Sequence, residues 1–290
     1  MKKYFNRIFI FFILVLLVVF VLKDVNLYEL YSLLKIINPL YLFLAVFSYL
    51  VYFLLWTFRW WYIFRKVFKV KFFFLLKVLF AGVFFNIITP GAGVGGELFR
   101  AYFLSKRYNK PKNKMLGVIL ADKIFHLVVM GFFAIFSILF VLIYAKISSN
   151  LKIILEILLV SVLFAFSLTI FLVLKKMNFN IGAFFKKMHF LSFIKKRFKD
   201  AEEFENYINK KTGELSGIIR KVVKNKKNIF MGIFLSFCIL ILEFFVSYFL
   251  FLSFGYHVNL LIVVIVVSLG LLIGILSLTP GGIGVVESVM

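Results

Sequence analysis

Long stretches of consecutive apolar residues recur along this chain, and they constrain its fold more than any other feature. They lie at about residues 5–22, 40–64, 115–144, 153–174 and 229–252. A helix of ~20 apolar residues crosses the ~30 Å hydrocarbon core of a bilayer. The chain is 63% hydrophobic and 16% charged, whereas soluble domains average about 45–50% and about 25%. The sequence therefore predicts an all-α polytopic membrane protein in which residues 1–290 form a single integral membrane domain.

The charged residues are strongly unbalanced, with 35 Lys and Arg against 12 Asp and Glu. In membrane proteins such an excess collects in cytoplasmic loops and fixes orientation. The basic stretches at residues 1–7 and 175–228 therefore predict a cytoplasmic N-terminus and a cytoplasmic segment 175–228, in the inner or plasma membrane. Because orientation accounts for the charge, we expect no nucleic-acid partner.

The cytoplasmic segment also carries apolar residues at helical spacing, from Phe204 to Val222. This pattern predicts an amphipathic helix. Its apolar face would lie against the inner leaflet, where its lysines meet anionic lipid. The alternative is a solvated linker helix with no role in lipid contact.

The apolar segment 72–88 ends in Thr89-Pro90-Gly91, and a glycine-rich stretch then leads to Glu97. A helix of 17 residues reaches only ~25 Å at ~1.5 Å per residue, which is short of the membrane core. Basic residues lie on both sides of this segment. These features predict a re-entrant hairpin over about residues 72–104 that returns to the cytoplasmic side.

The same pattern recurs at the end of the chain, where Thr279-Pro280-Gly281 is followed by Glu287. In both copies the glutamate follows the threonine by eight residues (97 minus 89, and 287 minus 279). The spans predicted between the copies are odd in number, so the second hairpin, at about 260–290, would be inverted relative to the first. The sequence thus predicts an inverted repeat with two Gly/Pro-broken re-entrant hairpins, a pattern typical of substrate sites in transporters. The alternative is that each motif is an ordinary interfacial turn.

Breaking a helix inside the membrane has a chemical consequence. Proline lacks an amide donor, and glycine frees the backbone. The exposed backbone groups then need protein or water partners, and the restarted helix directs its positive end into the break. We therefore expect Thr89, Pro90 and Gly91, together with Thr279, Pro280 and Gly281, to contribute to a site that suits an anion.

Ionisable residues inside apolar spans are candidates for function because they are costly to bury. In one interpretation Arg100 and Lys123 contact a phosphate, while Glu97, Asp122 and Glu287 orient the cations or carry protons. In the other, Glu97–Arg100 and Asp122–Lys123 are buried pairs that only pack the helices.

Two further charged residues, Arg59 and Glu243, lie within predicted spans. Arg59 lies among aromatic residues near the end of the span 40–64, and we expect it to extend to the lipid headgroups. Glu243, near the middle of the span 229–252, has no cation close in sequence and is a weaker candidate. His189 and His257 lie in loops without other ligands nearby, so no metal or cofactor is expected.

The motifs from Thr89 to Arg100, Ala121-Asp122-Lys123, Arg59-Trp60 and Thr279 to Glu287 resemble the lysylphosphatidylglycerol synthase transmembrane region family, also called flippase-like or UPF0104 proteins. The resemblance covers nearly the whole chain. It implies a multi-span membrane protein whose best-known relatives move an aminoacylated anionic lipid made by an attached aminoacyltransferase domain. Other members stand alone or lie near polyprenol-phosphate sugar chemistry.

The resemblance implies a flippase-like transporter that moves an anionic or phosphate-bearing lipid, either a phospholipid or a polyprenol-phosphate-linked lipid. Membrane lipids are the expected partners, with a lipid-modifying enzyme or glycosyltransferase as a candidate protein partner. The chain has no synthase domain and is not expected to be an enzyme. It also stops soon after Glu287, where the family usually continues, so we expect a fragment.

The sequence leaves two alternative functions open. One is a membrane-embedded transferase that acts on a lipid-linked substrate, although the chain lacks an Asp-x-x-Asp or Asp-x-Asp motif for a metal–diphosphate. The other is an accessory subunit of a lipid-modifying enzyme.

Overall fold

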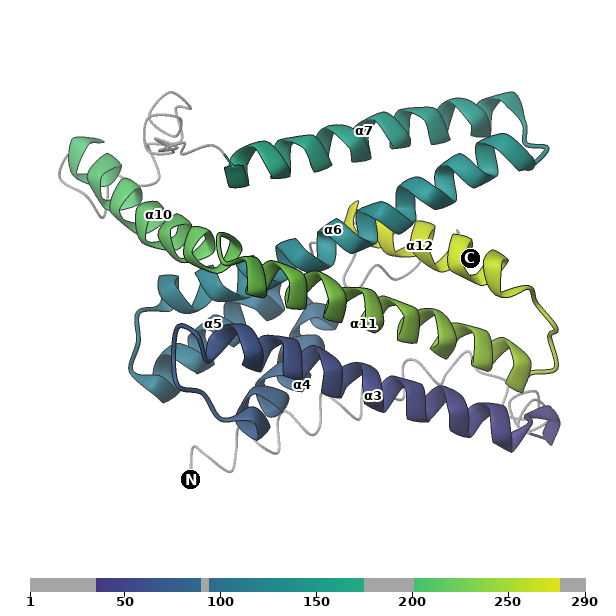
Figure 1. The fold of residues 1–290 in the computed structure, drawn as a ribbon, viewed down its shortest axis with the longest axis horizontal. Coiled ribbons are helices and arrows are strands. Elements are labelled where there is room, and N and C mark those ends of the chain that lie inside the picture. Colours follow the sequence, from purple (N-terminus) through teal and green to yellow (C-terminus); the bar gives the residue numbers. More distant parts are fainter. Residues whose placement is uncertain (1–34, 90–93, 175–200, 277–290) are drawn as a thin grey trace.

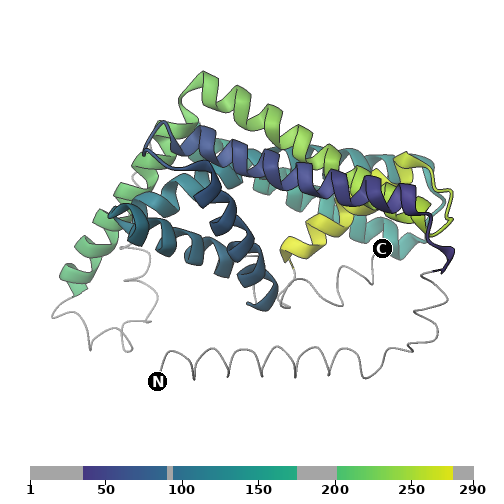
Figure 2. The same ribbon diagram turned by 90° about the horizontal axis from the view of Figure 1, so that it is seen from below.

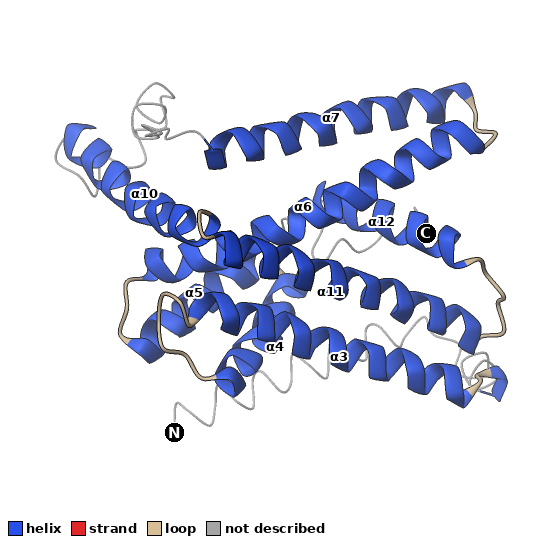
Figure 3. Ribbon diagram, viewed as in Figure 1, coloured by secondary structure: helices blue, strands red, loops and turns tan. Residues whose placement is uncertain are grey.

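The computed structural model describes residues 35–89, 94–174 and 201–276, and this part of the chain consists of helices and short loops (Figure 3). The helices are α3 (Pro39–Phe64), α4 (Phe72–Ile88), α5 (Val94–Tyr108), α6 (Lys112–Tyr144), α7 (Ser149–Leu174), α10 (Ala201–Val223), α11 (Lys226–Ser253) and α12 (Leu260–Leu276). The predicted all-α class is therefore confirmed.

Helices α3, α6 and α11 are long and apolar enough to cross a membrane. On α3, Asn38 caps the first turn by accepting from the amide of Leu40, and Pro39 occupies the first turn, where its missing amide costs nothing. The helix then exposes large apolar side chains, namely Leu40, Phe43, Phe47, Leu50 and Leu54. A contiguous exposed surface of this kind indicates contact with lipid rather than water.

Helix α6 is the central element of the fold. One hydrophobic cluster joins it to α3, α4, α5 and α10, a second joins it to α11 and α12, and a third joins it to α7 and α12. Polar residues on the first part of α6 are therefore placed where several helices meet.

Helices α3 and α11 lie side by side and antiparallel (Figure 1). The amide of Asn38 donates to the carbonyl of Ser253 at 2.8 Å, and farther along the pair Arg59 donates to Ser236. These two contacts fix the register of the two helices.

Helices α4 and α5 form an antiparallel hairpin beside this pair (Figure 2). At its open end the amide of Lys71 donates to the Tyr108 hydroxyl at 3.0 Å, and near the break the amide of Gly96 donates to the Asn86 side chain at 2.7 Å. Thr89 ends α4 in an extended conformation, as expected for a residue that precedes proline. The helix break predicted at the first motif is thus present.

The apolar face predicted in the cytoplasmic segment lies on α10, and its described part packs against α6. Val222 is fully buried, and Leu215 and Ile218 lie against Gly117 of α6. From Leu215 to Val222, α6 and not the inner leaflet covers the apolar face, because an amphipathic pattern shows that a face is covered but not by what. The side chains of Phe204, Tyr207 and Ile208 lie outside the described residues, so the expectation for them stays a prediction.

Several predicted features lie outside the described residues. These are the first span at 5–22, the motif from Thr279 to Glu287 and the stretch 175–200. Helix α12 corresponds to the first arm of the predicted second hairpin. The inverted repeat therefore stays a prediction.

Candidate functional site

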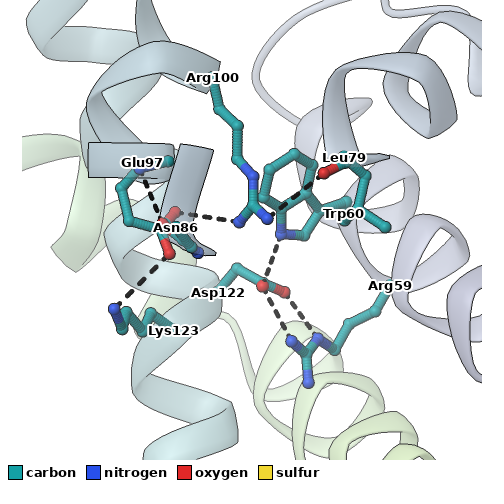
Figure 4. Close-up of polar contacts among 9 residues, drawn as sticks. Arg59, Trp60, Leu79, Asn86, Glu97, Arg100, Asp122 and Lys123 are labelled. Carbon is teal, nitrogen blue, oxygen red and sulfur yellow. Dashed lines mark hydrogen bonds and ion pairs between the residues drawn. The ribbon is translucent and has the colours of Figure 1, made fainter. Parts of the chain in front are cut away.

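Five charged side chains meet where α3, α5 and α6 come together, and we call them the ionic cluster (Figure 4). They are Arg59, Glu97, Arg100, Asp122 and Lys123. With three cations and two carboxylates, the cluster has a formal charge of +1 (3 minus 2). Four of the five were predicted as site residues, and the structure brings those four together.

Arg59 and Asp122 form a bidentate ion pair between α3 and α6. The Nε and Nη2 atoms of Arg59 donate to the two carboxylate oxygens of Asp122 at 2.7 and 2.9 Å. Their exposed fractions are 2% and 3%, so the pair is inside the helix bundle. The expectation that Arg59 extends to the headgroups is wrong: aromatic neighbours suit a packed pocket as well as a membrane interface.

Two further hydrogen bonds involve this pair. The indole Nε1 of Trp60 donates to Asp122 at 2.7 Å, and Arg59 Nη1 donates to the hydroxyl of Ser236 at 2.6 Å. Ser236 in turn donates to the carbonyl of Gly232 within α11. Asp122 thus accepts three hydrogen bonds from α3 that join it to α6, and the Arg59–Ser236 bond adds α11 to the same arrangement.

Glu97 is shared by the other two cations. Its Oε2 atom is 3.3 Å from Arg100 Nη1, and its Oε1 atom is 3.6 Å from Lys123 Nζ. The Glu97–Arg100 pair predicted from the sequence is therefore present. The alternative pairing of Asp122 with Lys123 is wrong, since adjacent residues on a helix point in different directions and each finds its partner on another helix.

Arg100 is enclosed more completely than its neighbours in the cluster. Its guanidinium lies over the rings of Trp56 and Trp60, 5.1 and 4.9 Å from their centroids, within the range of cation–π attraction. Its exposed fraction is 1%, yet its Nε atom has no hydrogen-bond partner among the described residues. A buried donor left unpaired normally costs about 1–3 kcal/mol, and this one lies against Gly82 of α4.

Glycine allows Arg100 to lie where it does. A Cβ atom at Gly82 of α4 would collide with the Arg100 side chain, and one at Gly96 would collide with the carbonyl of Gly82. The two arms of the hairpin therefore touch backbone to backbone, which only a residue without a side chain permits.

Polar groups at the ends of the hairpin arms find hydrogen-bond partners within the hairpin itself. Asn86 accepts from the amide of Gly96 near the start of α5, where helix amides lack intrahelical partners. The hydroxyl of Thr89 donates to the carbonyl of Phe85 at 2.5 Å, so it points back to its own helix. Pro90, Gly91, Thr279, Pro280, Gly281 and Glu287 lie outside the described residues.

Sequence reasoning missed part of this site. Trp56, Trp60, Asn86 and Ser236 all contact the cluster or the hairpin. Asn86 could have been found, because an amide side chain three residues before Thr89 in an apolar run needs a partner. Nothing in the sequence indicates that Ser236 lies beside Arg59, since 177 positions separate them.

Electrostatically, the cluster suits a negatively charged group. Lys123 has 31% of its side chain exposed and is the cation of the cluster that is accessible from outside. Its ammonium is held by Glu97 across 3.6 Å, a longer and weaker contact than the Arg59–Asp122 pair. Lys123 is therefore the residue at which an anion can meet the cluster from outside.

Comparisons with known proteins identify relatives over most of the chain. A UPF0104 membrane protein of Methanothermobacter thermautotrophicus is 28% identical, with 87% of this chain and 74% of the relative covered. The UPF0104 membrane proteins MJ1595 of Methanocaldococcus jannaschii and PH1989 of Pyrococcus horikoshii are 29% and 26% identical, over 87% and 86% of this chain and 74% and 75% of those proteins.

No solved structure matches the chain. The family described as the lysylphosphatidylglycerol synthase TM region matches residues 7–290, which confirms the resemblance drawn from the motifs. The chain therefore belongs to the lysylphosphatidylglycerol synthase transmembrane region family of membrane proteins.

Proposed function

We propose that this protein is a flippase-like transporter that moves an anionic or phosphate-bearing lipid across the membrane. The observation that carries the proposal is the ionic cluster: an excess cation in an apolar helix bundle, with Arg100 Nε unpaired and Lys123 accessible. Ionisable groups are kept inside a membrane at a cost that function commonly explains. A phosphate oxygen supplies the acceptor that Arg100 Nε lacks.

The contacts suggest an order of events. The phosphate first meets Lys123 and displaces its weak contact with Glu97, and it then reaches Arg100 between the two tryptophan rings. Glu97 holds both cations in place before the lipid arrives. Arg59 and Asp122 pair with each other instead of binding the lipid, and they hold the helices of the site in place.

The family supports a lipid as substrate, since its name refers to the membrane region of a lipid synthase. We propose a phospholipid or a polyprenol-phosphate-linked lipid, moved without a covalent step by this chain. We also propose that the protein lies in the cell membrane with a cytoplasmic N-terminus, and that a lipid-modifying enzyme or glycosyltransferase supplies or receives the lipid.

Reconstitution tests this proposal. The purified chain is placed in phosphatidylcholine vesicles that carry fluorescent NBD-phosphatidylglycerol, and dithionite, which bleaches the outer leaflet, reports how fast lipid changes sides. A hydrogen bond to a charged group contributes about 1.5–3 kcal/mol, so Arg100→Gln should slow movement about tenfold to a hundredfold if that contact is made in the rate-limiting step. Because Arg100 is buried, Lys123→Gln, at a partly exposed site, provides a second variant that is not expected to disturb folding.

Matched controls are available on the surface. Arg65 and Lys152 are exposed, so Arg65→Gln and Lys152→Gln should leave the rate unchanged. Glu287→Gln tests the predicted second motif and should also slow movement. If wild-type protein moves no lipid, or if Arg100→Gln and Lys123→Gln both move it at the wild-type rate, the proposal is wrong.

A further inference from the structure

A half-buried acid outside the ionic cluster lies on α11, the helix that packs along α3. Glu243 is in the membrane-crossing helix α11, and its Oε2 atom is buried without a hydrogen-bond partner among the described residues. No ion pair is found for it in that part of the chain. An isolated carboxylate in such surroundings is far costlier than a protonated one.

The register of α3 and α11 places Glu243 relative to the cluster. Arg59 contacts Ser236, and Tyr52 and Glu243 each lie seven residues farther along their antiparallel helices. Seven residues are about two turns, or about 10 Å, so both side chains return to the helix face that carries the Arg59–Ser236 contact. Glu243 and Tyr52 thus lie in the α3–α11 interface, about two turns from the Arg59–Ser236 contact.

The groups that face Glu243 can be named helix by helix. Tyr49 and Tyr52 of α3 interact with it electrostatically, and Tyr52 also interacts with Arg59 and Arg100. Helix α6 contributes Asp122, Lys123 and His126 at the level of the cluster. Helix α12 contains no titratable residue, and α10 packs at the opposite end of α11.

Two stacked tyrosines of α3 lie between Glu243 and the exposed face of that helix. Tyr49 is 48% exposed, and its ring stacks on that of Tyr52 with centroids 5.8 Å apart. A hydroxyl can both donate and accept, so Tyr52 suits the passage of a proton to and from Glu243 inside the bundle. On the other side, Trp56 follows Tyr52 by one turn on α3 and covers Arg100.

We propose that Glu243 is the proton-coupling site of this protein, and that it links proton movement to the lipid movement proposed above. The carboxylate takes up a proton from one side of the membrane and releases the same proton to the other during each transport cycle. Uptake removes a negative charge about two helical turns from Arg59, and Tyr52 lies between the two sites. The inference rests on the proposed function and adds its coupling ion.

A pH gradient across the same vesicles tests the inference. With one proton carried per lipid, a difference of one pH unit should drive an about tenfold difference in NBD-phosphatidylglycerol between the leaflets at steady state. Glu243→Gln retains the size of the side chain but cannot take up or release a proton, so it should move lipid to equal leaflet concentrations whatever the gradient. A pH-sensitive dye inside the vesicles should report proton entry with the wild type and none with the variant.

The controls separate failure of the inference from failure of the proposed function. Glu156→Gln removes an exposed acid on α7 and should keep the full response to the gradient. If the wild type moves no lipid, the proposed function fails and the inference fails with it. If the wild type moves lipid but ignores the pH gradient, responds to a sodium gradient at equal pH, or behaves the same with Glu243→Gln, only the inference is overturned.

Discussion

Replacing Asp122 by asparagine tests the central ion pair of the structure. The substitution keeps the shape of the side chain and one carbonyl oxygen, but it removes the negative charge and replaces the other oxygen with an amide donor. Arg59 would then be a buried cation with an exposed fraction of 2% and no carboxylate. One of the donors Arg59 Nε, Arg59 Nη2 and Trp60 Nε1 would also face the amide group instead of an oxygen.

The magnitude follows from these contacts. Breaking a buried ion pair from one side costs about 3–5 kcal/mol, because the remaining charge is left uncompensated. We therefore expect Asp122→Asn to lower the free energy of unfolding by about 3–5 kcal/mol. Arg59→Met should have a similar effect, because it leaves the carboxylate with Trp60 alone. The double variant leaves no buried charge unpaired, so its loss should be smaller than the sum of the two single losses by several kcal/mol.

The assay is unfolding by titration with SDS in mixed micelles, followed by circular dichroism for the wild type and the three variants. The four unfolding free energies form a double-mutant cycle that gives the interaction energy of the pair. If Asp122→Asn costs less than about 1 kcal/mol, or if the two single losses simply add, then Arg59 and Asp122 do not interact as the structure shows.

The same unfolding assay checks two other predictions. Gly82→Ala places a Cβ atom against the Arg100 side chain and should lower the free energy of unfolding by about 1–3 kcal/mol. Gly213→Ala on α10 serves as the control, because a Cβ atom there meets nothing within 4 Å, and it should raise that free energy by about 0.5–1 kcal/mol. Equal effects of the two substitutions would contradict the close approach of the hairpin arms. Trp60→Phe removes a donor to the carboxylate of the buried ion pair and should lower the free energy of unfolding by about 1–3 kcal/mol. Trp56→Phe removes an indole N–H that has no partner among the described residues and should lower it less. The reverse order would show that the wrong tryptophan has been assigned to the carboxylate.

The helices of this protein could be predicted closely from the sequence because their causes are local. Pro39 and Asn38 start α3, and the proline after Thr89 ends α4. The interruption in the apolar segment also indicated the hairpin, since a short apolar run followed by glycines cannot continue as one membrane-crossing helix.

The partners within the site could not be predicted in the same way. Arg59 and Asp122 are 63 positions apart, and whether an arginine near a helix end points to lipid or into the bundle depends on neighbours that are distant in sequence. The same limit applied to Lys123, whose nearest acid in sequence is Asp122 but whose partner is Glu97. The presence of charged residues in apolar segments indicated the site. Which cation pairs with which carboxylate depends on the packing of α3, α5 and α6.

The backbone contact between Gly82 and Gly96 has a consequence for any conformational change in this protein. Two helices in such direct contact have no room to slide or separate without losing their packing, so the α4–α5 hairpin should move as one rigid body and carry Arg100 with it. The ion pair that joins this rigid body to α6 in the described residues is Glu97–Lys123. A swing of the hairpin would then require this pair to break and the apolar packing of α4 and α5 against α3 and α6 to loosen, but no helix would have to unwind.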